Sequence, residues 1–199
     1  MGGRSGVKSR RMKPGDDPEF FRFPAPEGRS RESTIVLKAD GHFEHDGAPV
    51  EHRKLEQAMH TWVGRHPDDG RFILTNGYDW TYLTVEDAPF FVRHLLPAED
   101  DAQGPVGIDT PVTLVLSDGT EEPLDPARVT VGADGALYTW VKASAPGGPF
   151  EAKLTRHAQT SLGRFLRGDG GAGEADAGGA VLLNGARFVP KPRDISPKK

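Results

Sequence analysis

Internal similarity divides this chain into two halves, and it constrains the fold more than any single motif does. Three segments of the first half recur in the same order in the second half. The first is an apolar strand that leads into Ala-Asp-Gly, at residues 35–43 and again at 129–137. Ala-Asp-Gly contains the residues that close a tight hairpin. A chain that repeats its elements in order is expected to fold as two similar modules.

The second recurring segment has the pattern of a helix. Residues 54–65 align without gaps on residues 153–164, and apolar side chains lie at the spacing of one helical face in both copies. We therefore predict helices at 54–65 and 153–166. The apolar positions are Leu55, Ala58, Met59, Trp62 and Val63 in the first copy, and Leu154, Ala158, Leu162, Phe165 and Leu166 in the second.

The third pair consists of strands at 72–80 and 180–188, each containing Asn-Gly, which suits a turn with positive φ. Neither module has enough apolar surface for a core of its own, so the two are expected to pack together. The sequence predicts an α+β fold of two repeated hairpin-helix-hairpin modules with antiparallel sheets packed together. A further hairpin is expected at 111–124, around Ser117-Asp-Gly119.

The expected boundaries follow from composition. Residues 1–32, which begin with a basic Gly/Ser-rich stretch, are predicted to be a disordered tail, and 191–199 a second tail. The modules are predicted at 33–97 and 98–190, with a flexible glycine-rich loop at 168–179.

Charge and composition exclude several classes of function. The chain has 199 residues, no cysteine, and no apolar run long enough to span a bilayer, so we expect neither a thiolate metal site nor a membrane protein, and we expect a cytoplasmic location. The basic leader is a candidate for contact with nucleic acid, but the net charge of −4 argues against that partner.

Motifs for cofactors and catalysis are absent or misplaced. Residues 168–173 match G-x-G-x-x-G, but they follow a predicted helix, whereas a dinucleotide site needs a preceding strand, so no cofactor is predicted. His42, Glu44 and His45 do not converge with His52 or His60 as metal ligands would, so no metal is predicted.

Three segments carry a resemblance to a known family: "ADGHFEHDGAPV", "DDGRFILTN" and "TVEDAPFFV". Their order resembles the bacterial domain-of-unknown-function family 1285, from about Thr34 to about Pro190. The most specific motifs are residues 69–72 and 85–90. The resemblance implies an α+β fold of repeated motifs and a role in signal transduction through ligand or partner binding, with no established activity. The second half has no Val-Glu-Asp-Ala-Pro motif after Phe188.

The stretch 80–87 gives the candidate site. Alternation along one strand places Trp80, Tyr82 and Glu86 on one face and Asp87 on the other. Pro89 lacks the N–H that Asp87 would bond in an Asx-turn, so Asp87 needs another partner. We expect that partner to be water or, within the chain, Arg71, Arg93 or the Phe90 N–H.

Two interpretations of this stretch remain open. Asp87 is either a structural latch, or it lines a groove between the modules with Arg71, Trp80, Tyr82 and Glu86 and orients a cationic or hydroxyl-bearing ligand. The resulting hypothesis is a non-enzymatic module that binds an unknown small molecule or protein partner. The alternative is a small hydrolase or transferase with Glu86 or Asp87 as general base, which needs a buried carboxylate with a raised pKa. The sequence leaves the oligomeric state open.

Overall fold

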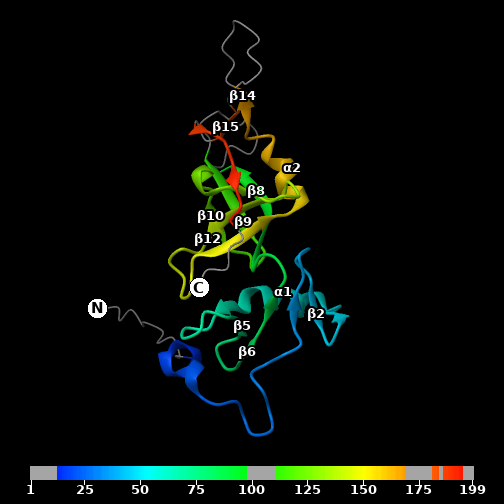
Figure 1. Cartoon of the computed structure of the whole chain (residues 1–199), viewed down its shortest axis with the longest axis vertical. Helices are drawn as coiled ribbons and strands as arrows, with labels where there is room; N and C mark the ends of the chain where they lie inside the picture. Colours follow the sequence, from blue (N-terminus) through cyan, green and yellow to red (C-terminus); the bar gives the residue numbers. More distant parts are fainter. Residues whose placement is uncertain (1–12, 98–110, 169–180, 184–185, 195–199) are drawn as a thin grey trace, which may run out of the picture.

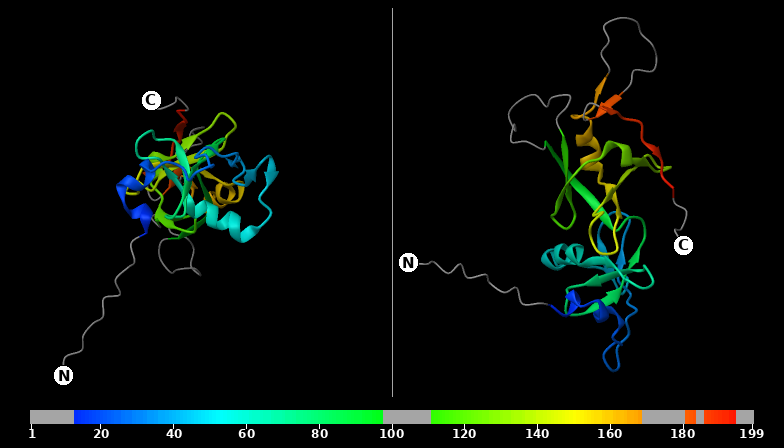
Figure 2. Two further views of the ribbon diagram at one scale, coloured as in Figure 1. Left: turned by 90° about the horizontal axis from the view of Figure 1, so that it is seen from below. Right: turned by 90° about the vertical axis from the view of Figure 1, so that its left-hand side faces the viewer.

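The computed structural model describes residues 13–97, 111–168, 181–183 and 186–194, and it has an α+β fold. Its α-helices are α1 (Arg53–Trp62) and α2 (Arg156–Leu162), one in each half. The halves are stacked along the long axis of the molecule (Figures 1 and 2). Short 3₁₀ helices lie at Pro14–Asp16, Pro18–Arg22 and Pro126–Arg128.

The strands are short, as the content of 25 glycines and 17 prolines favours. In the first half they are β1 (Val36–Leu37), β2 (Phe43–His45), β3 (Ala48–Pro49), β4 (Val63–Arg65), β5 (Phe72–Thr75), β6 (Trp80–Tyr82), β7 (Thr84–Val85) and β8 (Phe90–Pro97). After these come β9 (Val112–Leu116), β10 (Glu121–Pro123), β11 (Thr130–Val131), β12 (Leu137–Val141), β13 (Phe150–Leu154), β14 (Arg167–Gly168), β15 (Val181–Leu183), β16 (Ala186–Arg187) and β17 (Lys191–Pro192).

Strand pairing follows the same plan in both halves. The first half has the order β3-β2-β1-β7, and the second has β13-β12-β11-β17 within a larger sheet. In each set the first two pairs are antiparallel and the last pair is parallel. Each half also has an antiparallel three-stranded sheet, β4-β5-β6 or β14-β15-β16.

Strand β8 links the halves. It lies within the range 33–97, yet it pairs with β9 and β13 in the seven-stranded sheet of the second half. Most strand pairs are antiparallel, as predicted, but its pairing with β13 is parallel, as are those of β1 with β7 and β11 with β17. Each of these parallel pairs joins strands separated by intervening elements, and such long crossovers permit parallel pairing. The hairpin expected at 111–124 is confirmed as β9 and β10.

The predicted helices are displaced from the observed ones. Lys153 and Leu154 lie in strand β13, and α2 begins only after Thr155, whose side chain accepts a hydrogen bond from the Ala158 N–H. Strand β13 buries alternate residues, and an apolar residue such as Leu154 satisfies both this period and a helical one. In the first half, residues 63–65 form β4 instead of extending α1.

The helix caps also correct the alignment between the halves. His52 caps α1 through the Leu55 N–H and Thr155 caps α2 through the Ala158 N–H, so Arg53 and Arg156 are each the first residue of a helix. The gapless alignment pairs Arg53 with Ala152 instead. This error is about one helical turn, which keeps the apolar face in place and leaves the pattern unchanged.

Both predicted tails are partly wrong. Residues 13–32 pack on the first half: Phe20 is buried with Ile73 and Trp80, and the Gly15 N–H donates to the Gly77 carbonyl at 2.9 Å. Burial of these aromatic rings offsets the entropy lost when the segment is ordered. In the other tail, residues 191–192 form β17, paired with β11. Residues 1–12, 169–180 and 195–199 lie outside the described part of the chain.

Candidate functional site

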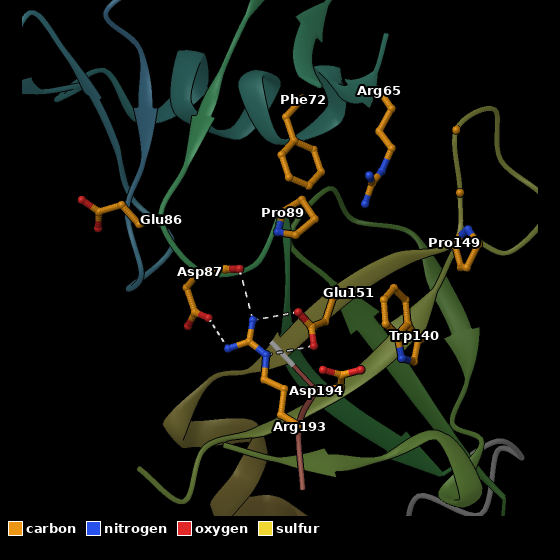
Figure 3. A pocket seen from close by; sticks show the side chains of 12 residues that line it. Arg65, Phe72, Glu86, Asp87, Pro89, Trp140, Pro149, Glu151, Arg193 and Asp194 are labelled. Carbon is orange, nitrogen blue, oxygen red and sulfur yellow. Dashed lines mark hydrogen bonds and ion pairs between the residues drawn. The ribbon is translucent and has the colours of Figure 1, made fainter. Parts of the chain in front are cut away.

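A cavity of about 590 Å³ lies between the halves (Figure 3). The first half contributes the end of β4 and the start of β5, and the link from β7 to β8 crosses one side. The second half contributes β12, β13, the loop between them and the residues after β17. The lining residues are Arg65, Phe72, Glu86, Asp87, Pro89, Trp140, Gly147, Gly148, Pro149, Glu151, Arg193 and Asp194.

Arg193 joins the two halves at one side of this cavity. Its Nη1 donates to Asp87 Oδ1 at 2.6 Å, and its Nη2 and Nε donate to the Glu151 carboxylate at 2.7 and 3.0 Å. The guanidinium carbon lies 3.7 Å from the centre of the Tyr138 ring. Asp87 Oδ2 also accepts from Lys153 Nζ at 2.7 Å and from the Tyr138 hydroxyl at 3.0 Å. We call these five residues the Arg193 network.

The Arg193 network keeps Asp87 ionised. Burial alone would raise the pKa of this carboxyl, because only 14% of its side chain is exposed. The hydrogen bonds from Lys153, Arg193 and Tyr138 together outweigh burial and hold the pKa of Asp87 below its ordinary value. Burial and the bond to Asp87 raise the pKa of the Tyr138 hydroxyl, which stays protonated and donates.

Glu86 lies on the outer side of the segment between β7 and β8, and a cation and a backbone N–H hold its carboxylate too. It pairs with Lys38 Nζ and accepts from the Ala39 N–H at 3.1 Å. The hydrogen bond from Lys38 is the largest cause that lowers the pKa of Glu86, and the Ala39 N–H adds to it. Both predicted carboxylates are therefore stabilised in their charged form.

Residues 192–194 occupy the place in the second half that residues 85–87 occupy in the first. The Glu86 N–H donates to the Leu37 carbonyl at 3.0 Å, and the Arg193 N–H donates to the Val131 carbonyl at 2.8 Å, each just beyond a parallel strand pair. The two strand ends meet at the cavity, where Asp87 bonds Arg193. The sequence motif is absent from the second half, but its structural position is filled.

Arg65 lies on the other side of the cavity, and Figure 3 shows its guanidinium pointing inward. Its Nε is buried without a hydrogen bond, and its Nη1 reaches the Gly70 carbonyl at a long 3.4 Å. The guanidinium lies 4.7 Å from the centre of the Phe72 ring and 5.4 Å from that of Phe150. Burial lowers the pKa of Arg65, and no ion pair to it is found within the described part of the chain.

Comparison with solved structures identifies the fold. A DUF1285 family protein from Silicibacter pomeroyi DSS-3 superposes with a TM-score of 0.55 at 18% identity, covering 86% of this chain and 92% of that one. The chain has a DUF1285-type fold. A DUF1285 family protein from Shewanella baltica OS155 matches 68% of this chain and 95% of its own, with a TM-score of 0.48 at 18% identity. No family model and no curated protein matches the sequence.

The DUF1285-type fold agrees with the family resemblance of the sequence motifs, but it separates the predicted site residues. Glu86 and Asp87 line the cavity, whereas Arg71, Trp80 and Tyr82 do not. The reason is that residues 80–87 are two strands in different sheets rather than one: β6 pairs with β5, and β7 pairs with β1. The alternation assumed along one strand is broken at Leu83, which is buried.

Arg71, Trp80 and Tyr82 belong to a cluster in the first half. Arg71 donates to both oxygens of Glu32, at 2.8 and 2.7 Å, and its guanidinium lies 3.5 Å from the centre of the Tyr82 ring. The Tyr82 hydroxyl donates to Asp69 at 2.7 Å. Trp80 is 6% exposed and packs with Phe20 and Ile73, a group that we call the N-terminal cluster. Arg71 is thus not the partner of Asp87.

Sequence reasoning missed most of the cavity: Arg65, Phe72, Trp140, Glu151 and Arg193. The sequence pattern places Arg65 at the end of a predicted helix, Phe72 at the start of a predicted strand and Arg193 in a predicted tail. Among these missed parts of the lining, the run Gly147-Gly148-Pro149 is a local sequence signal, because glycine and proline mark an unusual backbone. The rest of the cavity arises from long-range pairing.

The described ranges contain no group of three His, Asp or Glu side chains arranged to hold a metal ion. In the same ranges, neither α1 nor α2 is long and apolar enough to cross a membrane.

Proposed function

We propose that this chain is a non-enzymatic binding module that holds a small molecule in the cavity between its halves. The observation that carries the proposal is the cavity itself. Its volume of about 590 Å³ suits a small ligand, and both halves supply its walls. Its polar groups at Asp87, Glu151 and Arg193 are fixed by hydrogen bonds, so the walls are preorganised.

The state of the carboxylates favours binding over catalysis. A general base works best when its pKa lies near the pH at which the enzyme operates. The pKa values of Glu86 and Asp87 are instead lowered, because cations and N–H donors already hold their oxygens. The lowered pKa values disfavour either residue as the general base of a hydrolase or transferase.

We propose that this binding serves bacterial signal transduction. An occupant of the cavity touches both halves, and a ligand that prefers one arrangement of two packed units shifts their equilibrium toward it. We propose that the halves arose by duplication, which the matching order and direction of their strand pairs supports. We place this activity in the cytoplasm.

The chain's three tryptophans provide a test of occupancy. Trp140 lines the cavity, whereas Trp80 is buried in the N-terminal cluster and Trp62 packs in the core of the first half. After incorporation of 5-fluorotryptophan, fluorine NMR of the full chain reports each ring separately. Trp140→Phe assigns the cavity signal. A screen of small molecules of every charge class is expected to shift the Trp140 resonance and leave those of Trp62 and Trp80 in place.

Two results would count against the proposal. A screen in which no compound moves the Trp140 resonance leaves the cavity without a ligand. Equal shifts at Trp62 and Trp80 would indicate binding elsewhere or a general change in the fold.

A further inference from the structure

The inference that follows rests on the proposed function and concerns the class of ligand. Its starting point is that the Arg65 guanidinium has more N–H donors than hydrogen bonds. A guanidinium has five N–H donors, and normal bonds to oxygen span about 2.7–3.2 Å. Arg65 makes one contact to a backbone carbonyl, at 3.4 Å, and its Nε is buried without a bond.

The fold holds Arg65 in this position. Its guanidinium packs against the rings of Phe72 and Phe150. The loop from β12 to β13 closes on its stem: a side-chain carbon at Gly147, where φ is +74°, would lie 2.7 Å from Arg65 Cβ. Since the arginine stem and the loop backbone are in contact, glycine is needed there twice over, for space and for conformation.

A partly buried cation without a counter-charge favours an anion beside it. Burial lowers the pKa of Arg65 because water is removed without a carboxylate to replace it. The planar fork of a guanidinium matches the two oxygens of a carboxylate. The guanidinium end of Arg65 points into the cavity (Figure 3), so an anionic group there would lie beside a cation that has no carboxylate partner in the described part of the chain.

The other charged residues of the cavity limit how much negative charge a ligand can carry. Asp87 and Glu151 are compensated by Arg193 and Glu86 by Lys38, and Asp194 also lines the cavity, so several carboxylates lie close to any ligand. A doubly charged phosphate would be repelled by them more strongly than a singly charged carboxylate. The electrostatics favour a monoanion.

The remaining lining determines the body of the ligand. Phe72, Pro89, Trp140 and Pro149 give an apolar wall between Arg65 and the Arg193 network (Figure 3). Aromatic and proline side chains offer rigid contact area to a flat apolar group. We propose that the cavity binds a small organic monocarboxylate, with its carboxylate on Arg65 and its apolar body against Phe72 and Trp140.

The test compares probes of one shape and different charge. Titration calorimetry on the full chain uses 3-phenylpropionate, its neutral amide 3-phenylpropanamide, the cation 3-phenylpropylammonium, and phenyl phosphate. The carboxylate is expected to bind at least about tenfold more tightly than the amide, the contribution of about one charge-assisted bond pair. Fluorine NMR at Trp140 places each bound probe in the cavity.

Variants test whether the preference for the carboxylate over the amide depends on Arg65. Arg65→Gln is expected to remove the advantage of the carboxylate over the amide while leaving amide binding unchanged, and Arg65→Lys should retain part of it. Arg128→Gln, at an exposed arginine in a short 3₁₀ helix outside the cavity, is the matched control and should keep the full preference. Thermal denaturation of each variant confirms that it is folded.

The outcomes separate this inference from the proposed function. If the amide, the ammonium ion or phenyl phosphate shifts Trp140 and binds as tightly as the carboxylate, the monocarboxylate inference is wrong and the binding function stands. The inference is also wrong if Arg65→Gln keeps the preference. If neither these probes nor the wider screen moves Trp140, both proposals fail.

Discussion

Arg65 and Arg193 enter the same cavity from opposite halves, and they differ in what surrounds them. Arg193 donates to two carboxylates, and its side chain is 14% exposed. Arg65 packs between aromatic rings and has one long contact to a carbonyl. An arginine whose donors are satisfied within the chain holds the structure together, whereas one with unsatisfied donors is available to a ligand. The same residue type thus serves two purposes, and substitutions at each should behave differently.

The largest effect is expected for Arg193→Gln. This change leaves Asp87 and Glu151 without their shared cation while both are largely buried, at 14% and 18% exposed. Removing one partner from such a pair costs about 3 kcal/mol in the free energy of unfolding. Urea denaturation measures the loss. The control is again Arg128→Gln, whose ion pair with Asp125 is half exposed, and which should cost less than about 0.5 kcal/mol.

If Arg193→Gln lowers the free energy of unfolding no more than Arg128→Gln does, the contrast between the two arginines is wrong. The Arg193 network would then make no measurable contribution to holding the halves together.

Asp87→Asn should have the next largest effect. The amide keeps the size of the carboxylate but weakens charge-assisted bonds from Lys153 and Arg193, and it presents an NH₂ group where only donors point inward. We expect a loss of about 2 kcal/mol in the free energy of unfolding. Denaturation at neutral pH tests this, with binding of 3-phenylpropionate measured alongside. A variant that is stable but loses the ligand would assign Asp87 to recognition instead of structure.

At acid pH, the free energies of unfolding of the wild-type chain and Asp87→Asn should become more similar. The pKa of Asp87 is lower in the folded chain than its ordinary value of 3.8. Its ionised form therefore adds stability above that value, and the contribution is lost as the pH falls through the lower folded pKa. Denaturation curves from about pH 6 to about pH 2 should show the difference in the free energy of unfolding narrowing toward the acid end. A gap that does not depend on pH would contradict the assigned ionisation.

The smallest effect on folding is expected for Arg65→Gln. Loss of the contacts with Phe72 and Phe150 costs about 0.5–1 kcal/mol, and removal of a desolvated cation offsets part of this. The free energy of unfolding should change by less than about 1 kcal/mol. A loss as large as that of Arg193→Gln, measured in the same urea series, would show that Arg65 is structural and would remove the contrast between the two arginines.

Some of the local structure can be predicted from residues that are neighbours in the sequence. The Ala-Asp-Gly turns form as predicted: the Lys38 N–H donates to the His42 carbonyl, and the Gly132 N–H donates to the Ala136 carbonyl, at 2.9 and 2.8 Å. Such turns depend on the φ preferences of a few neighbouring residues, which the sequence contains. The need of Asp87 for a distant partner was predictable for the same reason, since Pro89 has no N–H to offer.

The partner of Asp87 was decided by tertiary structure. Arg71 lies on the first half, bonded to Glu32, and Arg93 lines a separate cavity beside α1, while Arg193 comes from a segment expected to be a tail. What brings it there is the parallel pairing of β11 with β17, which places the chain after β17 opposite the chain after β7. Local patterns do not encode such contacts, because a parallel pair forms only when a long loop closes and the intervening elements pack. The turns and the unmet need of Asp87 were therefore set by the sequence alone, and the cavity with its two arginines was set by the packing of the halves.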